Sequence, residues 1–504
     1  MSRIRSFLSN MSFTQILVFG YTMVILVSAV LLMLPISSRE RAFTALNDCI
    51  FTTTSALSGT GLTLFDTYTY WSLFGQIVIL IVIQIGGIGF MSMAIFALSY
   101  TGRKIGLKQR FTMRESVAGF SGGGVVKMTR FILKGTIYCE TAGAIALSVF
   151  FIPKIGVGKG IYFAIFHSIS AFCTAGIDIM GYFEPGSSII TAADSWLLNV
   201  TLIILLTIGG IGYITWGDVV EHKWHFKKYR LQSKIVIMVT ILFYILGIAE
   251  MILVEWNAPS LSSADGAGQK LLMSSMLVTS GRDAGFAPLN VALLKESTLL
   301  MIICFMFIGG APGSTACGIK TTTFAVMVLT IASVFRRKKS VECFGRRFEN
   351  TIIKDASCVT TLYLLVVIIS SIVISAIEDV KILPVMFEVV SAINCSIVAS
   401  ALPLVIISRA SLIPSSMLTF FATWMAAPAL ISTASSFAPV TFPSRISFTS
   451  AAFSSGVPPT KSSFLHRVNP NCSGVIVYFV TLPSASSQTS VSALMEISSK
   501  QSLP

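Results

Sequence analysis

Three glycines stand near the ends of three similar stretches of sequence and could help to hold a cation. They are Gly61 in SALSGTGLTLFDT, Gly176 in SISAFCTAGIDIMG and Gly285 in LVTSGRDAGFAPLN, and they recur about every 110 residues. A cation that leaves water needs oxygen ligands, which the backbone carbonyls of converging loops can supply. Successive carbonyls point the same way only in unusual backbone conformations, which glycine adopts without a Cβ clash. The pattern therefore predicts a carbonyl-lined ion filter.

The predicted filter comprises the three glycines and their neighbours in each loop. Its residues are Gly59, Thr60, Gly61 and Leu62; Thr174, Ala175, Gly176 and Ile177; and Asp283, Ala284, Gly285 and Phe286. The alternative is that each glycine only permits a tight turn or close helix packing. That alternative would suffice for one loop, but three aligned loops favour the filter.

A second unusual segment follows the third loop. Each loop is followed by an apolar segment with an Ile-Gly-Gly motif, at Ile85, Ile208 and Ile308. The third segment reads FIGGAPGSTACGIKTTTF, and its glycines and proline cannot sustain a regular helix across a bilayer. A flexible break below a filter predicts a gate. A lysine in it could repel permeating ions or be displaced by them. The alternative is a kink that only packs against its neighbours. The predicted gate runs from Gly309 to Thr322 and includes Gly309, Gly310, Gly313, Ser314, Gly318, Lys320 and Thr321.

Helices that span a membrane must position these loops. The 504-residue chain is 54% hydrophobic and only 12% charged, whereas soluble proteins carry roughly 25% charged residues. Nearly uncharged runs, several long enough to cross a hydrocarbon core of roughly 30 Å, cover residues 15–34, 71–98, 196–216, 235–253, 299–319 and 360–377. The stretches before the glycines are too short to span and are predicted to enter and return as pore helices. We expect an all-α integral membrane protein with about eight transmembrane helices, in repeated helix–pore loop–helix units around one pore.

The net charge of +14 fits a membrane protein better than a nucleic-acid-binding protein, and no nucleic-acid partner is expected. Basic residues gather beside apolar segments, at residues 3–5, 103–134, 223–234 and 336–354. This is the pattern of cytoplasmic loops, and it predicts a multi-pass protein of the plasma membrane with a cytoplasmic N-terminus. The first apolar run is too long for a cleavable signal peptide.

The sequence offers little to an enzyme. Its nine cysteines stand singly, and the His222/His225 pair has few acidic or thiol residues near it in sequence. Glu140 and Glu250 lie in apolar segments, where we interpret them as pore-lining or paired rather than catalytic. No enzymatic activity, no cofactor and no metal other than the transported ion is expected.

The motifs together resemble the Trk/Ktr/HKT superfamily of potassium transporters, above all the bacterial Ktr-type pore subunit. They are TGLT with Asp66 after it, the SISAF and AGID runs, GRDAGF, and GGAPGSTACGIKTTTF, and the agreement covers roughly residues 12 to 392. The resemblance implies potassium uptake through the filter, either passive or as symport with sodium. It also implies four non-identical units around one pore, a homodimer in the lipid bilayer, and a separate cytoplasmic nucleotide-binding regulatory subunit at the basic loops.

One filter residue departs from the family. Asp283 stands where the family usually shows a small polar residue. Its carboxylate could raise the local concentration of cations, or it could pair with the neighbouring Arg282. The sequence leaves both readings open.

The fourth unit begins normally and then loses the pattern. The units are predicted at residues 1–102, 103–222 and 223–340, with the start of a fourth at 341–394 and an aberrant tail at 395–504. LPVMFEVVSA resembles the fourth pore helix, but Ile397 occupies the place of the expected glycine, and the family's arginine in the last helix has no clear counterpart. The tail holds ten of the chain's 17 prolines and two of its 37 glycines. We interpret it as a translation in the wrong reading frame or an unusual replacement; in the first case the chain could be a non-conducting product.

Overall fold

The computed structural model describes residues 13–89, 125–338, 340–396, 478–479 and 493–494. The chain divides into two units, residues 1–437 and 438–504. Within the described part of the second unit, β3 (Tyr478–Phe479) pairs antiparallel with β4 (Ala493–Leu494). Apart from these two strands and the last residues of a helix that ends at Ser396, the predicted tail lies outside the described residues.

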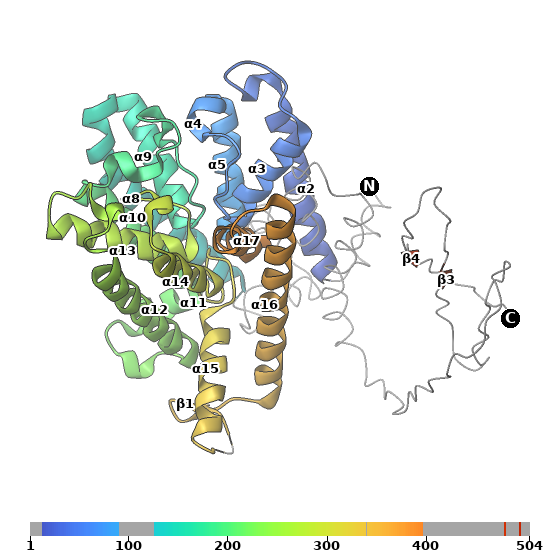
Figure 1. Ribbon diagram of the computed structural model, residues 1–504. Coiled ribbons are helices and arrows are strands. Elements are labelled where there is room, and N and C mark those ends of the chain that lie inside the picture. Colours follow the sequence, from blue (N-terminus) through green and yellow to red (C-terminus); the bar gives the residue numbers. More distant parts are fainter. Residues whose placement is uncertain (1–12, 90–124, 339, 397–477, 480–492, 495–504) are drawn as a thin grey trace, which may run out of the picture. The chain divides into compact units, whose positions relative to one another are not determined.

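The first unit repeats one order of helices (Figure 1). Three times, an apolar helix is followed by a middle helix and then by a second apolar helix, and a fourth set begins after them. The middle helix of each set is shorter than the helix before it and is called here a short helix. The helices are α2 (Phe13–Met33), α3 (Leu46–Ser58) and α5 (Leu73–Ile88); α8 (Val125–Ile155), α9 (Val157–Phe172) and α10 (Trp196–Gly210); α12 (Leu231–Glu250), α13 (Ala267–Asp283) and α14 (Glu296–Phe307); then α16 (Asn350–Glu378) and α17 (Ile382–Ser396).

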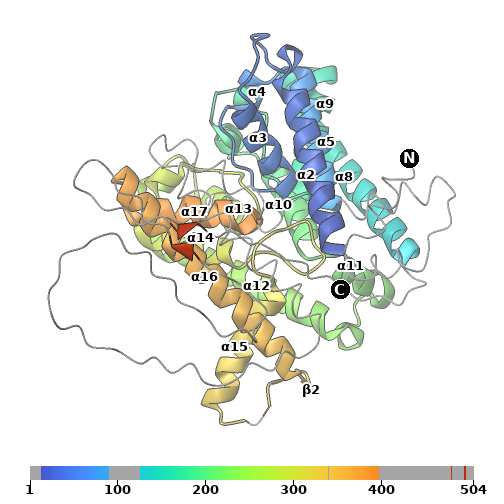
Figure 2. The same cartoon turned by 90° about the vertical axis from the view of Figure 1, so that its right-hand side faces the viewer.

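Other elements lie within and between these sets. They are the helices α4 (Thr67–Tyr70), α11 (Tyr213–His222) and α15 (Thr321–Phe335), the strands β1 (Glu342–Cys343) and β2 (Arg346–Arg347), the 3-10 helices η1 (Pro35–Ser37), η2 (Met180–Tyr182), η3 (Ser188–Ala192), η4 (Phe226–Lys228), η6 (Pro259–Leu261) and η7 (Val291–Leu293), and the π-helical turn η5 (Met251–Glu255). In two views at right angles, α4 and α9 lie at one end of this unit and α15 lies at the other (Figures 1 and 2).

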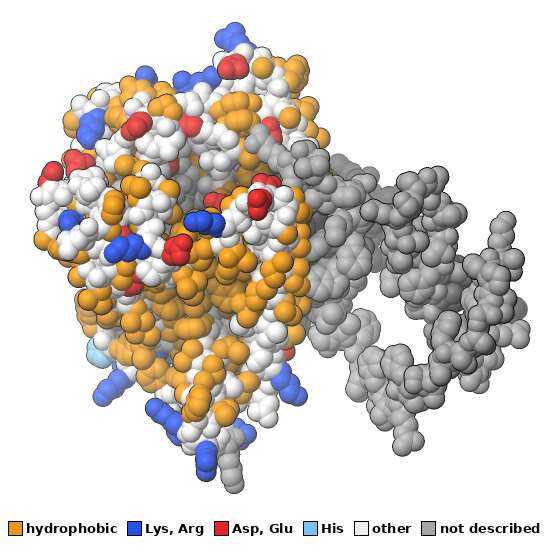
Figure 3. Space-filling model, in the orientation of Figure 1, with side chains coloured by type: hydrophobic (Ala, Val, Ile, Leu, Met, Phe, Trp, Pro, Cys, Tyr) orange, Lys and Arg blue, Asp and Glu red, His pale blue; other side chains and the backbone are white. Residues whose placement is uncertain are grey.

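The outer surface of the first unit suits a lipid environment. By length and composition, three helices of the described part can cross a membrane, Met128–Ile155, Leu231–Glu255 and Asn350–Glu378, and a fourth span is possible if α10 and α11, bent by 98°, count as one. Large apolar side chains on these helices, such as Ile145, Leu242 and Leu365, are exposed. Figure 3 shows hydrophobic side chains over the middle of one face of the first unit, with lysines and arginines at the end where α15 lies. Such a surface is stable when hydrocarbon replaces water around it.

The Ile-Gly-Gly motifs mark close crossings between helices. A Cβ on Gly86 of α5 would collide with the carbonyl oxygen of Leu57, near the end of α3, and a Cβ on Gly209 of α10 would collide with that of Phe172, at the end of α9. Only glycine leaves room for the helix to pass the end of the preceding short helix. The first two motifs are therefore explained by packing, and they set the height at which α3 and α9 end.

Candidate ion pathway

The three loop glycines meet in space. A Cβ on Gly61 would lie 2.6 Å from the carbonyl oxygen of Ala175, and a Cβ on Gly176 would lie 2.6 Å from the Cα of Gly285. A Cβ on Gly285 would lie 3.8 Å from the Cα of Gly61. No side chain fits at the first two positions, because real Cβ atoms do not approach backbone atoms so closely. The fold thus brings together three loops that are far apart in sequence.

The first two loops share an unusual backbone, and the third loop differs. Gly61 and Gly176 have φ angles of 77° and 68°, in the left-handed region that favours glycine. Thr174, with φ of 52°, adopts this region despite its branched side chain, which costs on the order of 1–3 kcal/mol. Gly285 does not adopt it, and Ala284 before it is extended. The backbone of the third loop therefore differs from that of the first two.

Two serines hold the carbonyl that follows each of the first two glycines. Ser55 of α3 donates to the carbonyl oxygen of Leu62 at 2.6 Å, and Ser170 of α9 donates to that of Ile177 at 2.5 Å. Both serines stand six residues before their loop glycine. This six-residue spacing between serine and glycine is a signal that is already present in the sequence. The third loop has Thr279 at this position, and Thr279 donates to Ser275 within its own helix instead.

The predicted gate contacts the end of each of the three short helices. The Cys317 thiol donates to the carbonyl oxygen of Ser58 at 2.9 Å, and the Thr315 hydroxyl donates to that of Phe172 at 3.1 Å. From the third short helix, the Arg282 guanidinium donates to the carbonyl oxygen of Gly309 at 3.0 Å. Thr315 also lies 3.4 Å from the hydroxyl of Thr174, a predicted filter residue. The segment therefore contacts the filter loops or the helices that carry them.

The remaining residues of the predicted gate hold the segment to itself and to α10. Gly313 and Gly318 have positive φ angles of 68° and 79°. The backbone N–H of Ala311 donates to the carbonyl oxygen of Gly210 at 2.9 Å, and that of Thr321 donates to Gly310 at 3.1 Å. Ser314 donates to Ala311 at 2.7 Å, and the Lys320 ammonium donates to Ala316 at 2.7 Å.

Arg282 is a buried cation between the third loop and the predicted gate. Its side chain is 4% exposed, and its second amino group donates to the Thr240 hydroxyl at 3.2 Å. A buried guanidinium must have hydrogen-bond partners, because an unpaired charge is costly in a low-dielectric interior. The described residues do not include the side chain of Asp283, so its two possible roles both stay predictions.

The two carboxylates predicted as pore-lining or paired both accept hydrogen bonds from neutral side chains. Glu140 of α8 accepts from the Gln84 amide at 2.9 Å, and Glu250 of α12 accepts from the Thr298 hydroxyl at 2.9 Å. The Cys173 sulfur, next to the predicted filter, lies 3.9 Å from the same oxygen of Glu140. Of the two interpretations, the contacts favour pairing.

Two aspartates lie just beyond the filter glycines. Asp178 accepts from the backbone N–H of Met180 at 3.0 Å and from the Ser188 hydroxyl at 2.9 Å. Burial raises the pKa of the Asp178 carboxyl to about 6, while these two hydrogen bonds act to lower it and the nearby Asp66 acts to raise it further. Asp66 caps α4 by accepting from the N–H groups of Tyr68 and Thr69.

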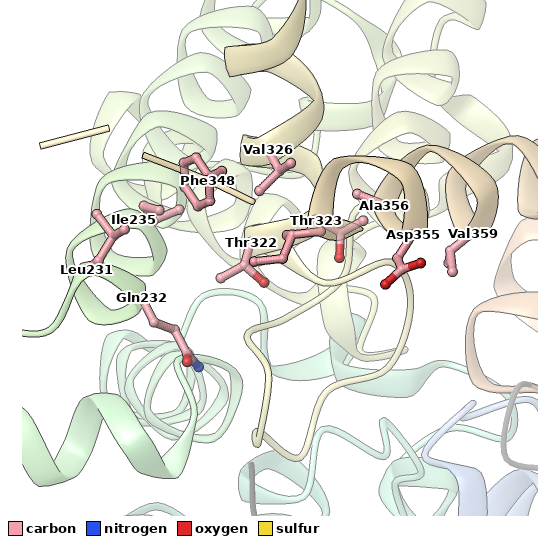
Figure 4. Close-up of a pocket in the computed structure, with 11 residues that line it drawn as sticks. Leu231, Gln232, Ile235, Thr322, Thr323, Val326, Phe348, Asp355, Ala356 and Val359 are labelled. Atoms are coloured by element: carbon pink, nitrogen blue, oxygen red, sulfur yellow. The ribbon is translucent and has the colours of Figure 1, made fainter. Parts of the chain in front are cut away.

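A cavity of about 510 Å³ lies away from the filter loops, between α12, α15 and α16 (Figure 4). Its walls are mostly apolar, with polar groups from Gln232, Thr322, Thr323 and Asp355. Thr322 is the last residue of the predicted gate, and no predicted filter residue lines the cavity.

Comparisons with known proteins place the chain among membrane transporters. The family model described as TrkH, cation transport protein, matches residues 8–396. The potassium/sodium uptake protein NtpJ of Enterococcus hirae is 33% identical over 74% of this chain and 81% of its own length. The Ktr system potassium uptake protein B of Bacillus subtilis is 32% identical over 75% and 83%, respectively.

A solved structure shares the fold. The crystal structure of the potassium transporter TrkH from Vibrio parahaemolyticus superimposes with a TM-score of 0.55, at 17% identity and over 75% of each chain. The predicted all-α membrane architecture is confirmed by this likeness and by the helices of the first unit.

Proposed function

The chain belongs to the TrkH family of cation transport proteins, and we propose that it takes up potassium ions across the plasma membrane. It is a transporter and not an enzyme, as membership of this family establishes. Relatives about 30% identical to it carry the names of potassium or potassium/sodium uptake proteins. The observation that carries the proposal is the meeting of Gly61, Gly176 and Gly285 at one place, where their loops can offer carbonyl oxygens to an ion.

In the proposed mechanism, a potassium ion exchanges its hydration shell for carbonyl oxygens of the three loops. The ligands would come from Gly59–Leu62, Thr174–Ile177 and Asp283–Phe286. Ser55 and Ser170 bind the carbonyls of Leu62 and Ile177 and so anchor the first two loops, whose backbone does not have to reorganise when an ion arrives. Conduction also requires weak binding, and carbonyl dipoles bind less strongly than carboxylates would.

We propose that residues 309–322 form the gate of this pathway. The bonds of Thr315, Cys317 and Gly309 to the three short helices hold the segment beneath the loops. The neutral bonds of Thr315 and Cys317 are each worth about 1 kcal/mol, and the bond from the charged Arg282 is worth about 1.5–3 kcal/mol. The segment can therefore leave when Arg282 finds another partner. In this proposal Lys320, bonded to the Ala316 carbonyl, keeps a positive charge beside the path while the gate is closed.

The wider arrangement follows from the same proposal. Four units, at residues 1–102, 103–222, 223–340 and from 341 on, would surround one pore, with the N-terminus in the cytoplasm. A homodimer, a cytoplasmic nucleotide-binding regulatory subunit at the basic loops, and sodium coupling are further parts of it. The Enterococcus hirae relative is named a potassium/sodium uptake protein, and this name supports a test of whether sodium flux is coupled to potassium flux here.

A second candidate is a non-conducting product of a changed reading frame. The family match ends at residue 396, where the composition turns rich in serine and proline. A ring that lacks its fourth loop has lost one quarter of its carbonyl ligands. Such a chain would insert in the membrane and conduct poorly.

Growth of a potassium-uptake-deficient bacterium at sub-millimolar potassium tests the proposal. The chain should restore growth, and the Gly176→Ser variant should not, because its side chain would collide with the backbone at Gly285. Gly158→Ser is the matched control, since a Cβ at Gly158 meets no atom within 4 Å. Equal growth with Gly176→Ser would contradict the filter. No growth with any variant, at normal amounts in the membrane, would favour the non-conducting product.

A further inference from the structure

One outer loop contacts residues that follow all three filter glycines. Residues 180–193, called here the outer strap, connect α9 to α10 and include the 3-10 helices η2 and η3. The strap lies between α9 and α10, the helices on either side of the second loop, yet its contacts extend to residues that follow the first and third loop glycines.

The strap is bonded to the second loop through Asp178. This residue stands two positions after Gly176, and its two carboxylate oxygens accept from the Met180 N–H and the Ser188 hydroxyl, both in the strap. Ser188 has a φ angle of 47°, which a serine adopts only where its surroundings hold it there. Its hydroxyl is therefore presented at a fixed place.

The same hydroxyl connects the strap to the third loop. The Ser188 oxygen accepts from the backbone N–H of Ala287 at 3.3 Å, and Ala287 stands two positions after Gly285. Asp178 and Ala287 thus occupy the same position relative to their glycines. One serine, donating to the first and accepting from the second, joins the second filter loop to the third.

The first loop contacts the strap through Asp66. Its carboxylate accepts from the backbone N–H of Gly186 at 2.9 Å. A Cβ on Gly181 would collide with both carboxylate oxygens, so the carboxylate lies directly on the strap. Tyr68 of α4 packs edge-on against Tyr182 of the strap, with ring centroids 5.3 Å apart. These contacts are independent of those made by Ser188.

From these contacts we propose that the outer strap sets the ion selectivity of the filter by fixing the spacing of its three loops, with Ser188 and Asp66 as the positioning residues. The inference rests on the proposed potassium uptake. Ser55 and Ser170 bind the first two loops from the short helices, and the strap binds residues that follow all three loop glycines. Discrimination between potassium and sodium depends on the size of the carbonyl cage or the number of its ligands, and both change when the loops move apart.

Two variants remove the links without a large change in the fold. Ser188→Gly deletes the hydroxyl and accepts the positive φ angle without strain. Asp66→Asn can keep the cap of α4 through its amide oxygen, but it places an N–H donor against the N–H of Gly186. Ser187→Ala is the matched control, because the Ser187 hydroxyl donates to Glu184 and Ser188 within the strap and does not contact a filter loop.

The test uses the full chain in two experiments. In vesicles, potassium and sodium fluxes are measured separately. In detergent, the thermal unfolding midpoint is measured in a potassium salt and in a sodium salt. The ratio of potassium to sodium flux should fall about tenfold in Ser188→Gly and Asp66→Asn, and stay unchanged in Ser187→Ala. The extra stabilisation by potassium over sodium should shrink in the same two variants.

The two hypotheses fail in different ways. An unmodified chain with neither potassium flux nor stabilisation specific to potassium would refute the proposed function, and the role of the strap with it. An unmodified chain with either property, together with Ser188→Gly and Asp66→Asn variants that keep its potassium preference, would refute the strap alone. A fall in Ser187→Ala equal to that in Ser188→Gly would also overturn the specific role of the Ser188 links.

Discussion

At the scale of single residues, hydroxyl groups anchor the loops that carry the three recurring glycines. Ser55 and Ser170 hold a carbonyl in their own loop, Thr315 connects the predicted gate to the end of α9, and Ser188 connects two loops. A hydroxyl suits this task because it donates and accepts without a net charge that would compete for the permeant ion.

Replacing Ser170 by alanine tests this role. The Ile177 carbonyl would lose its donor and gain freedom to turn away, so we expect weaker potassium uptake and a loss of about 1 kcal/mol in the free energy of unfolding. Initial uptake rates over a range of potassium concentrations should show a higher half-saturation concentration. Ser148→Ala is the control, since Ser148 donates to Ala144 within α8 and touches no loop. Unchanged uptake in Ser170→Ala would count against a role of this carbonyl in binding.

At the scale of elements, helix crossings set the depth of the short helices. Gly86 and Gly209 let α5 and α10 pass the ends of α3 and α9. In the third Ile-Gly-Gly motif, Gly309 instead lies against the Cys317 carbonyl of its own segment, because α14 ends just before it. The same motif therefore serves two different packings.

The crossing at Gly209 gives a prediction about stability. A Cβ in Gly209→Ala would collide with the Phe172 carbonyl and approach the Thr315 hydroxyl at 2.8 Å, so both α9 and the predicted gate must shift. We expect a loss of about 1–3 kcal/mol in stability, seen as a lower thermal unfolding midpoint in detergent. Gly158→Ala, in open space within α9, should leave the midpoint unchanged or slightly raised. An unaltered midpoint in Gly209→Ala would show that the crossing tolerates a methyl group.

At the scale of the whole molecule, three sets of helices bring their loops together, and α16 and α17 begin a fourth set. The family match and the last helix of the described first unit both end at residue 396. The sequence beyond this point changes composition within the stretch where a fourth loop is expected. The proposed ring of four loops therefore depends on the sequence that follows residue 396.

Resequencing the gene across the codons for Val390 to Leu402 addresses this directly. A change of reading frame should appear there, and its reversal should restore a glycine near position 397 followed by a spanning helix. Expression of the restored chain in the potassium-uptake-deficient host should then give faster growth than the chain with the present tail. A continuous frame in independent isolates would exclude the frame change and make the tail a replacement of the fourth unit.

The sequence by itself determined the membrane class, the family, the recurring glycines and the broken segment before Thr321, because hydropathy and the backbone freedom of glycine are local properties. It also contained the serines six residues before Gly61 and Gly176. Only the tertiary structure decided the conformation of Gly285, the contacts of Arg282 and Thr315, and the link from Asp178 through Ser188 to Ala287. These depend on which backbone groups the packed helices bring within 3.5 Å of a side chain, and local patterns do not encode the partner of a hydrogen bond between distant segments.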